Sequence, residues 1–115
     1  MSVTKYNWET CEDEAIEGTE DWVVVLSDIC FPDEWNSYNW NSIDVFYSPS
    51  RRKYFWYLDS GCSCKSQMDS IASVEDFRNG DRQAMINAFR GWASDLEPSK
   101  RANGAQVIQN FKEPE

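Results

Sequence analysis

Histidine is absent from this 115-residue sequence. Its absence removes the side chain that enzymes use most often as a general base near neutral pH. Serine–histidine–aspartate and cysteine–histidine arrangements are therefore excluded, and so is the HExxH metal motif. Neither GxxxxGK[ST] nor GxGxxG occurs, so no phosphate-binding loop is indicated. These absences favour a protein that is not an enzyme.

Long apolar runs are also absent, and none approaches the ~20 residues that a membrane span requires. The N-terminal stretch MSVTKYNWETCEDE has neither the positive region nor the apolar region of a signal peptide. We therefore expect a protein that stays in the cytoplasm where it is made and does not enter a membrane.

Basic residues are scarce in the first half of the chain. Residues 1–50 contain eleven acids and one base, Lys5, whereas residues 51–115 contain ten bases and nine acids. The acidic half repels phosphate backbones, so direct binding of nucleic acid is disfavoured and a partner with a basic surface is favoured. A simpler interpretation is that the charge keeps an aromatic-rich domain soluble.

Aromatic residues, in contrast, are abundant at 15%, which is enough to build one compact core. We expect a single domain over 1–115, with an acidic segment over 1–20 (a solvated loop or a short helix, with scope for mobility) and a loosely docked tail over 99–115. The β-branched run over 22–30 predicts a central strand. Residues 42–48 and 53–59 flank the turn PSRR and predict a β-hairpin.

Helix signals are confined to the last third of the chain. Ser73 and Asp76 resemble a capping box, which predicts a short helix over 73–79. Asp81 predicts the N-cap of a helix over about 82–96, whose apolar stripe is Met85, Phe89, Trp92, Ala93 and Leu96. Pro98 should stop it, and Gly91 within it suggests close packing on the sheet. The fold class is therefore α+β: a small antiparallel sheet with this helix packed on one face.

Four cysteines are present: Cys11, Cys30, Cys62 and Cys64. Zinc accepts four thiolates in tetrahedral geometry, but a zinc site usually shows two C-x₂₋₄-C pairs, and this chain has a single C-x-C. A reactive thiolate would need a neighbouring cation or base. The alternatives are a zinc site, a reactive thiol site, and a turn in which Cys62 and Cys64 stay reduced and serve only as small residues.

The segment 31–42 is predicted to be a loop that carries Trp35, Tyr38 and Trp40 among asparagines and serines. Such a composition suits a protein-binding surface, although rings of this kind also serve to cover the end of a sheet. We take these three aromatic residues, together with the acidic Glu12, Asp13 and Glu14, as the candidate partner-binding residues.

The stretch YFWYLDSGCSCKS resembles small proteins of actinobacterial tailed phages that carry a D-S-G-C-S-C loop after an aromatic strand; here that loop is Asp59 to Cys64. The resemblance implies that the protein is made in the cytoplasm of an infected bacterium. It implies no particular activity, because the proteins it resembles have no known one. Our leading hypothesis is a non-enzymatic accessory protein that binds a host protein through an acidic and aromatic surface. The alternatives are a small zinc- or thiol-dependent protein, and an acidic mimic of nucleic acid that blocks a DNA-binding host factor. The oligomeric state is left open.

Overall fold

The structure is a computed structural model, which describes residues 2–30, 40–61, 68 and 71–114. Its elements, in chain order, are β1 (Thr4–Asn7), β2 (Glu12–Ala15), β3 (Val23–Cys30), β4 (Trp40–Ser48), β5 (Lys53–Gly61), the 3₁₀ turn η1 (Val74–Asp76), β6 (Arg78–Gly80), α1 (Arg82–Ala93) and α2 (Pro98–Asn110). The α+β class predicted from the sequence is confirmed.

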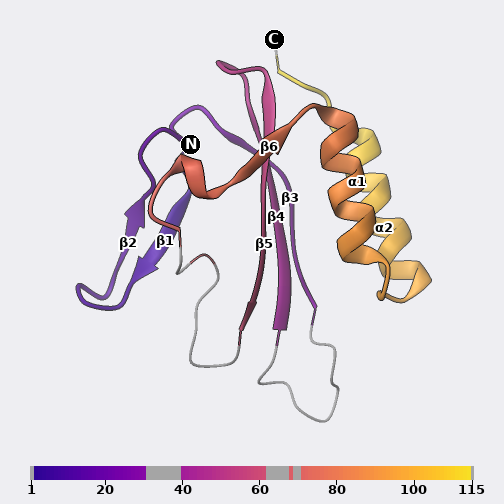
Figure 1. Ribbon diagram of the computed structural model, residues 1–115, viewed down its shortest axis with the longest axis horizontal. Helices are drawn as coiled ribbons and strands as arrows, with labels where there is room; N and C mark the ends of the chain where they lie inside the picture. The colour runs from indigo at the N-terminus through magenta and orange to yellow at the C-terminus, as the bar shows by residue number, and fades with distance from the viewer. Residues whose placement is uncertain (1, 31–39, 62–67, 69–70, 115) are drawn as a thin grey trace.

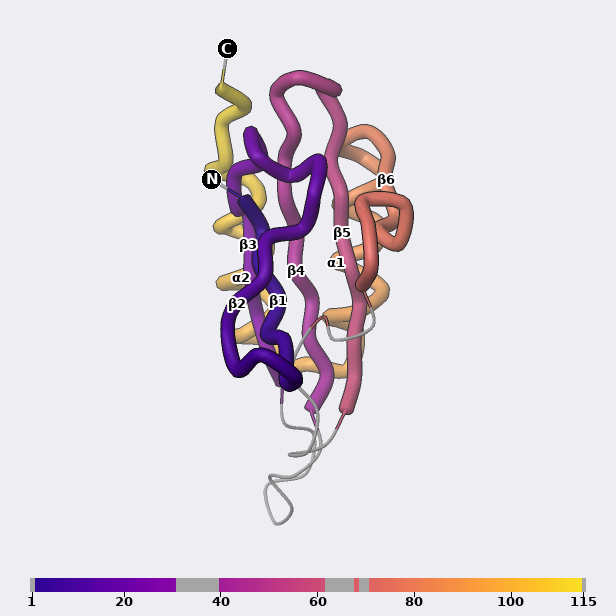
Figure 2. The backbone as a smooth tube through the Cα atoms, turned by 90° about the vertical axis from the view of Figure 1, so that its left-hand side faces the viewer, coloured from indigo at the N-terminus to yellow at the C-terminus, as the bar shows by residue number. Residues whose placement is uncertain are grey.

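The described elements form three layers (Figure 1). A four-stranded antiparallel sheet with the order β3-β4-β5-β6 lies in the middle. The helices α1 and α2 cover one face of this sheet, and the separate β1–β2 hairpin lies on the other side. Figure 2 shows the hairpin in front of the sheet, on the side of β3. The sheet therefore has two covered faces, and each needs an apolar core.

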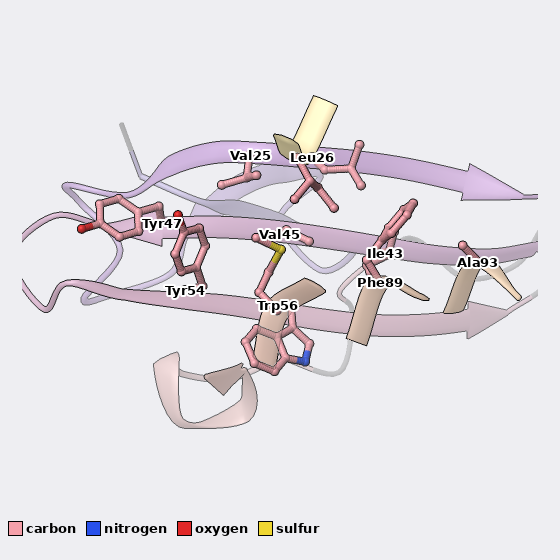
Figure 3. Packing of buried hydrophobic residues seen from close by; sticks show 11 residues of the cluster. Val25, Leu26, Ile43, Val45, Tyr47, Tyr54, Trp56, Phe89 and Ala93 are labelled. Carbon is pink, nitrogen blue, oxygen red and sulfur yellow. The ribbon is translucent and has the colours of Figure 1, made fainter. Parts of the chain in front are cut away.

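The β4–β5 hairpin is confirmed and extends beyond the predicted strands, with Trp40 paired with Gly61 at one end and Ser48 with Lys53 at the other. Alternation along β4 sends Ile43, Val45 and Tyr47 toward the helices. There they join Phe89, Ala93 and other apolar residues of the larger core (Figure 3). Asp44 and Phe46 lie on the opposite face of β4, which is the face toward the β1–β2 hairpin.

Asp81 is the N-cap of α1, as predicted, and its carboxylate accepts a hydrogen bond of 2.8 Å from the Ala84 N–H. The predicted stripe is correct in part: Met85, Phe89 and Ala93 are buried. The helix ends at Ala93, earlier than expected, and Pro98 begins α2 instead of following a stop. Proline suits this first position because its missing N–H would have no partner there in any case.

Two glycines of the helices have different surroundings. A Cβ atom on Gly104 of α2 would lie 2.5 Å from Cζ of Phe89, whereas a Cβ on Gly91 of α1 would meet no atom within 4 Å. The suggestion that Gly91 marks close packing is therefore wrong. The close approach is at Gly104, where the absence of a side chain lets α2 lie against the Phe89 ring.

We expect Gly104→Ala and Gly91→Ala to have opposite effects on the free energy of unfolding. Alanine at 91 should stabilise the protein by about 0.5–1 kcal/mol, because it favours helix without a clash. Alanine at 104 should destabilise it by about 1–3 kcal/mol, because the Phe89 ring is buried and cannot easily move. Urea denaturation of both variants checks this. Two stabilising alanines would contradict the close packing.

The structure corrects three sequence-based predictions. Residues 4–15 form a β-hairpin, not a loop or a helix. β3 is an edge strand of the described sheet, not a central one, because β4 is its only paired neighbour there. Its apolar run reflects cover on both faces, which an edge strand in a three-layer arrangement also has. Residues 73–79 form only one 3₁₀ turn followed by β6. Part of the predicted capping box is present, since the Asp76 carboxylate accepts from the Ser73 N–H at 3.2 Å.

The second core cluster lies on the hairpin side of the sheet. Its buried members are Val3, Ile16, Trp22, Phe46, Phe55, Ile71 and Phe77. Trp22 is central among them, because its ring stacks on Phe55 with 4.4 Å between centroids and meets Phe77 edge-on at 5.0 Å. Val3 and Ile16 flank the β1–β2 hairpin and connect it to this cluster. The hairpin is thus held against the sheet through its two ends.

Candidate binding surface on the N-terminal hairpin

The predicted partner-binding residues are separated by the fold. Glu12, Asp13 and Glu14 lie together on β2, and all three are exposed. Trp40 was expected in a loop, but it is the first residue of β4 and its side chain is only 6% exposed. Trp35 and Tyr38 lie outside the described residues. The described candidates at the surface are therefore the three acids of β2.

The hairpin turn is built by Asn7. Its side-chain oxygen accepts hydrogen bonds from the N–H groups of Glu9 and Thr10, at 2.9 and 3.4 Å. Its carbonyl oxygen accepts from the Cys11 N–H at 2.8 Å. Cys11 closes the turn with a φ of 58°, in the left-handed region. Asparagine favours such turns because its side chain can bond to its own backbone.

Next to this turn lies an aromatic pair, the exposed Trp8 and the half-buried Tyr6 of β1, which was not identified from the sequence as a binding site. The Trp8 side chain is 59% exposed, and its ring meets the Tyr6 ring edge-on with 4.9 Å between centroids. Exposed large aromatic rings are enriched in the energetic centres of protein interfaces. The sequence signal that could have found Trp8 is its position directly after a turn-forming asparagine in a strongly acidic segment.

The carboxylates of β2 have few partners among the described residues. Asn7 Nδ2 donates to Glu14 Oε2 at 2.8 Å. The only base of the hairpin, Lys5, donates its ammonium group to the Ile71 carbonyl. The Cys11 thiol, together with slight burial and the Asp13 carboxylate, raises the pKa of the Tyr6 phenol. The three carboxylic acids of β2 outnumber the single base of the hairpin, so this surface is acidic.

The bases of the helices lie on the other side of the sheet. The helices α1 and α2 contain Arg82, Arg90, Lys100 and Arg101 and no acid. Figure 1 shows these helices separated from the hairpin by the sheet, so the four bases of the helices and the three acids of β2 lie in different layers. A charge distribution of this kind orients an approaching partner as well as attracting it.

The cysteines are not brought together in the described structure. Cys11 is an exposed free thiol at the hairpin turn, and Cys30 is a half-buried free thiol at the end of β3. Cys62 and Cys64 lie outside the described residues. Over residues 2–30, 40–61, 68 and 71–114, no group of three or more cysteine, aspartate or glutamate side chains could hold a metal ion.

In the same part of the chain, no helix is long and apolar enough to cross a membrane.

Comparison with known proteins identifies one relationship. No curated protein and no solved structure matches the chain. Residues 31–111 match the family model described as a domain of unknown function, DUF7574. The match begins after β3 and includes β4, β5, β6 and both helices, which is more than half of the chain. The protein therefore belongs to the DUF7574 family.

Proposed function

We propose that the protein is a non-enzymatic binding protein whose β1–β2 hairpin engages a basic surface on a partner protein. The observation that carries this proposal is the combination of the exposed Trp8 ring with the exposed acids of β2 on one small hairpin. Charges at the rim of an interface accelerate encounter, while a large ring at its centre supplies affinity. The two features thus have complementary roles.

The phage resemblance of the sequence supports a more specific form of this proposal, in which the partner is a host protein of an actinobacterium and binding takes place in the infected cell's cytoplasm. A basic partner surface is also what a DNA-binding protein presents. Competition with duplex DNA is therefore the measurement that distinguishes an acidic mimic of nucleic acid from a ligand of another basic protein.

The test is affinity capture from an actinobacterial lysate with the full chain and two variants. One variant is Trp8→Ala, and the other combines Glu12→Gln, Asp13→Asn and Glu14→Gln. We expect each to reduce capture of the specific partner by about tenfold or more, the loss of about 1.4 kcal/mol of binding free energy. The charge variant should also show a weaker dependence of association on salt.

The control combines Asp95→Asn and Glu97→Gln, which neutralises two exposed acids between α1 and α2, on the other side of the sheet from the hairpin. This control should capture the partner as the unmodified chain does. If the hairpin variants capture the same proteins in the same amounts as the control, the hairpin is not the binding surface and the proposal fails.

A further inference from the structure

A groove lies between α1 and α2, which run side by side on one face of the sheet (Figure 1). It consists of two adjoining cavities of about 400 and 440 Å³, which share Phe89, Arg90 and Ala105 in their lining. The apolar part of the lining also includes the half-buried Ile86 and the buried Ile108. We call this feature the helix groove.

The helix groove is basic. Three arginines line it, Arg82, Arg90 and Arg101, and no acid does so over the described residues. The Arg82 guanidinium is already engaged by the Tyr54 hydroxyl and by two main-chain carbonyls near the end of α2. The Arg101 guanidinium donates to the Ser94 carbonyl over a long 3.4 Å. Arg90 is exposed, and within the described part of the chain it has no hydrogen bond or ion pair. It is therefore the cation best placed to receive an anionic partner.

The β1–β2 hairpin has the complementary chemistry on one of its faces. Asp13 pairs in register with Tyr6, and side chains opposite each other on antiparallel strands lie on the same face. The Trp8 ring contacts the Tyr6 ring, so it belongs to this face as well. Lys5, the only base of the hairpin, precedes Tyr6 in β1 and therefore lies on the opposite face. An exposed carboxylate and an exposed aromatic ring thus lie together, with no cation on the same face.

The two surfaces match in charge and in apolar character. A guanidinium group pairs with a carboxylate through two parallel hydrogen bonds and also stacks on aromatic rings. Figure 1 shows the hairpin and the helices on opposite sides of the sheet, so the hairpin of one chain can reach only the helix groove of another. The net charge of −9 repels whole chains from each other, so we expect the contact to be weak.

We propose that the protein associates head to tail, with the hairpin of one chain in the helix groove of a second copy. In this contact Asp13 pairs with Arg90, and the Trp8 ring covers Ile86 and Ala105. Each contact leaves one hairpin and one groove open, so the assembly extends beyond a dimer unless it closes into a ring. The inference rests on the proposed function in using the same hairpin, and self-association competes there with a host protein.

Sedimentation equilibrium of the full chain tests the association between about 10 μM and 1 mM. We expect the weight-average mass to rise with concentration and to exceed that of a dimer. Trp8→Ala and Arg90→Glu should each weaken the association by about tenfold or more. The matched control is Arg78→Glu, which makes the same charge change at an exposed position of β6 that lines neither cavity. This control should associate at least as strongly as the unmodified chain.

Mixtures of variants test which surfaces meet. Asp13→Arg and Arg90→Glu should each stay monomeric alone, because like charges then face each other across the contact. Their equimolar mixture should recover the association, because each chain then has a surface complementary to the other. A mixture of Trp8→Ala with Arg90→Glu has one working groove and one working hairpin, so it should stop at a dimer.

Three results would overturn the inference. The first is a monomer mass at every concentration up to about 1 mM. The second is association that Arg90→Glu leaves unchanged, or that the mixture of reversed charges does not restore, since the contact would then join other surfaces. The third is a monomeric chain that captures lysate proteins and loses them in Arg90→Glu, which would place another protein in the groove.

Failure of this inference is distinguishable from failure of the proposed function. Arg90→Glu leaves the hairpin intact, so it should capture a host partner at least as well as the unmodified chain. Hairpin-dependent capture by a chain that stays monomeric would reject only the self-association. Self-association that depends on Trp8 and Arg90, without hairpin-dependent capture of any lysate protein, would support the inference and reject only the host partner.

Discussion

Replacing Trp22 with alanine should lower the free energy of unfolding by about 3–5 kcal/mol, a large part of the stability of a domain of this size. Trp22 is 1% exposed, and its ring contacts Phe46, Phe55 and Phe77 at centroid distances between 4.4 and 5.5 Å. Alanine would leave a cavity in the cluster that holds the hairpin to the sheet. Urea denaturation followed by circular dichroism measures the change.

Trp8→Ala is the matched control, because it removes the same side chain from a position that is 59% exposed. Substitutions at exposed positions usually change stability by no more than about 0.5 kcal/mol. The two tryptophan variants should therefore differ by several kilocalories per mole. Equal denaturation midpoints for the two would mean that Trp22 does not occupy the centre of a packed core.

The second large effect concerns Tyr54 in alkaline solution. Burial and a hydrogen bond to Glu113 raise the pKa of the Tyr54 phenol to about 12, above its ordinary value of 10.0. The unfolded chain loses this proton near pH 10, whereas the folded chain keeps it until about pH 12. The unfolded state is therefore favoured increasingly over this interval, and stability should fall by about 2–3 kcal/mol.

The network around Tyr54 gives this effect its structural basis. The Tyr54 hydroxyl donates to Glu113 Oε2 at 2.6 Å and accepts from Arg82 at 2.8 Å. Arg82 also donates to the Ile108 and Phe111 carbonyls at the C-terminal end of α2. The phenol thus belongs to a group of contacts that holds α2 to the rest of the protein.

Tyr54→Phe separates the titration from the packing. It keeps the ring and should cost about 1 kcal/mol at neutral pH through the lost hydrogen bonds. Between pH 10 and pH 12, the free energy of unfolding should therefore fall by about 2–3 kcal/mol less in this variant than in the unmodified chain. Parallel pH profiles for the two proteins would contradict the raised pKa.

The elements predicted correctly are those that local patterns specify. The β4–β5 hairpin is encoded by β-prone runs around a short turn, and α1 by the Asp81 cap and its apolar stripe. The β1–β2 hairpin escaped prediction because β2, EDEA, is exposed along its whole length and shows no apolar alternation. Its pairing depends on the Asn7 turn and on distant contacts through Val3 and Ile16, which no local window contains.

The same difference applies to the candidate sites. The exposure of the acids of β2 could be predicted, because a dense acidic run is almost always at the surface. The burial of Trp40 and the exposure of Trp8 could not be predicted, because tryptophan occurs both in cores and at surfaces. Asp44 lies between Ile43 and Val45 in the sequence and resembles an outward-facing strand residue. Its side chain accepts a hydrogen bond from Ser27 of β3, a residue seventeen positions away along the chain, which no local window around Asp44 contains.

The position of Trp22 also bears on where this protein can be divided. The match to DUF7574 begins at residue 31, so Val3, Ile16 and Trp22 precede it, whereas their partners Phe46, Phe55 and Phe77 lie within it. A fragment cut at the family boundary would lack β3 and would expose those three phenylalanines to water. Exposed apolar patches of this kind promote aggregation. In this chain the boundary of the family match therefore passes through a hydrophobic core.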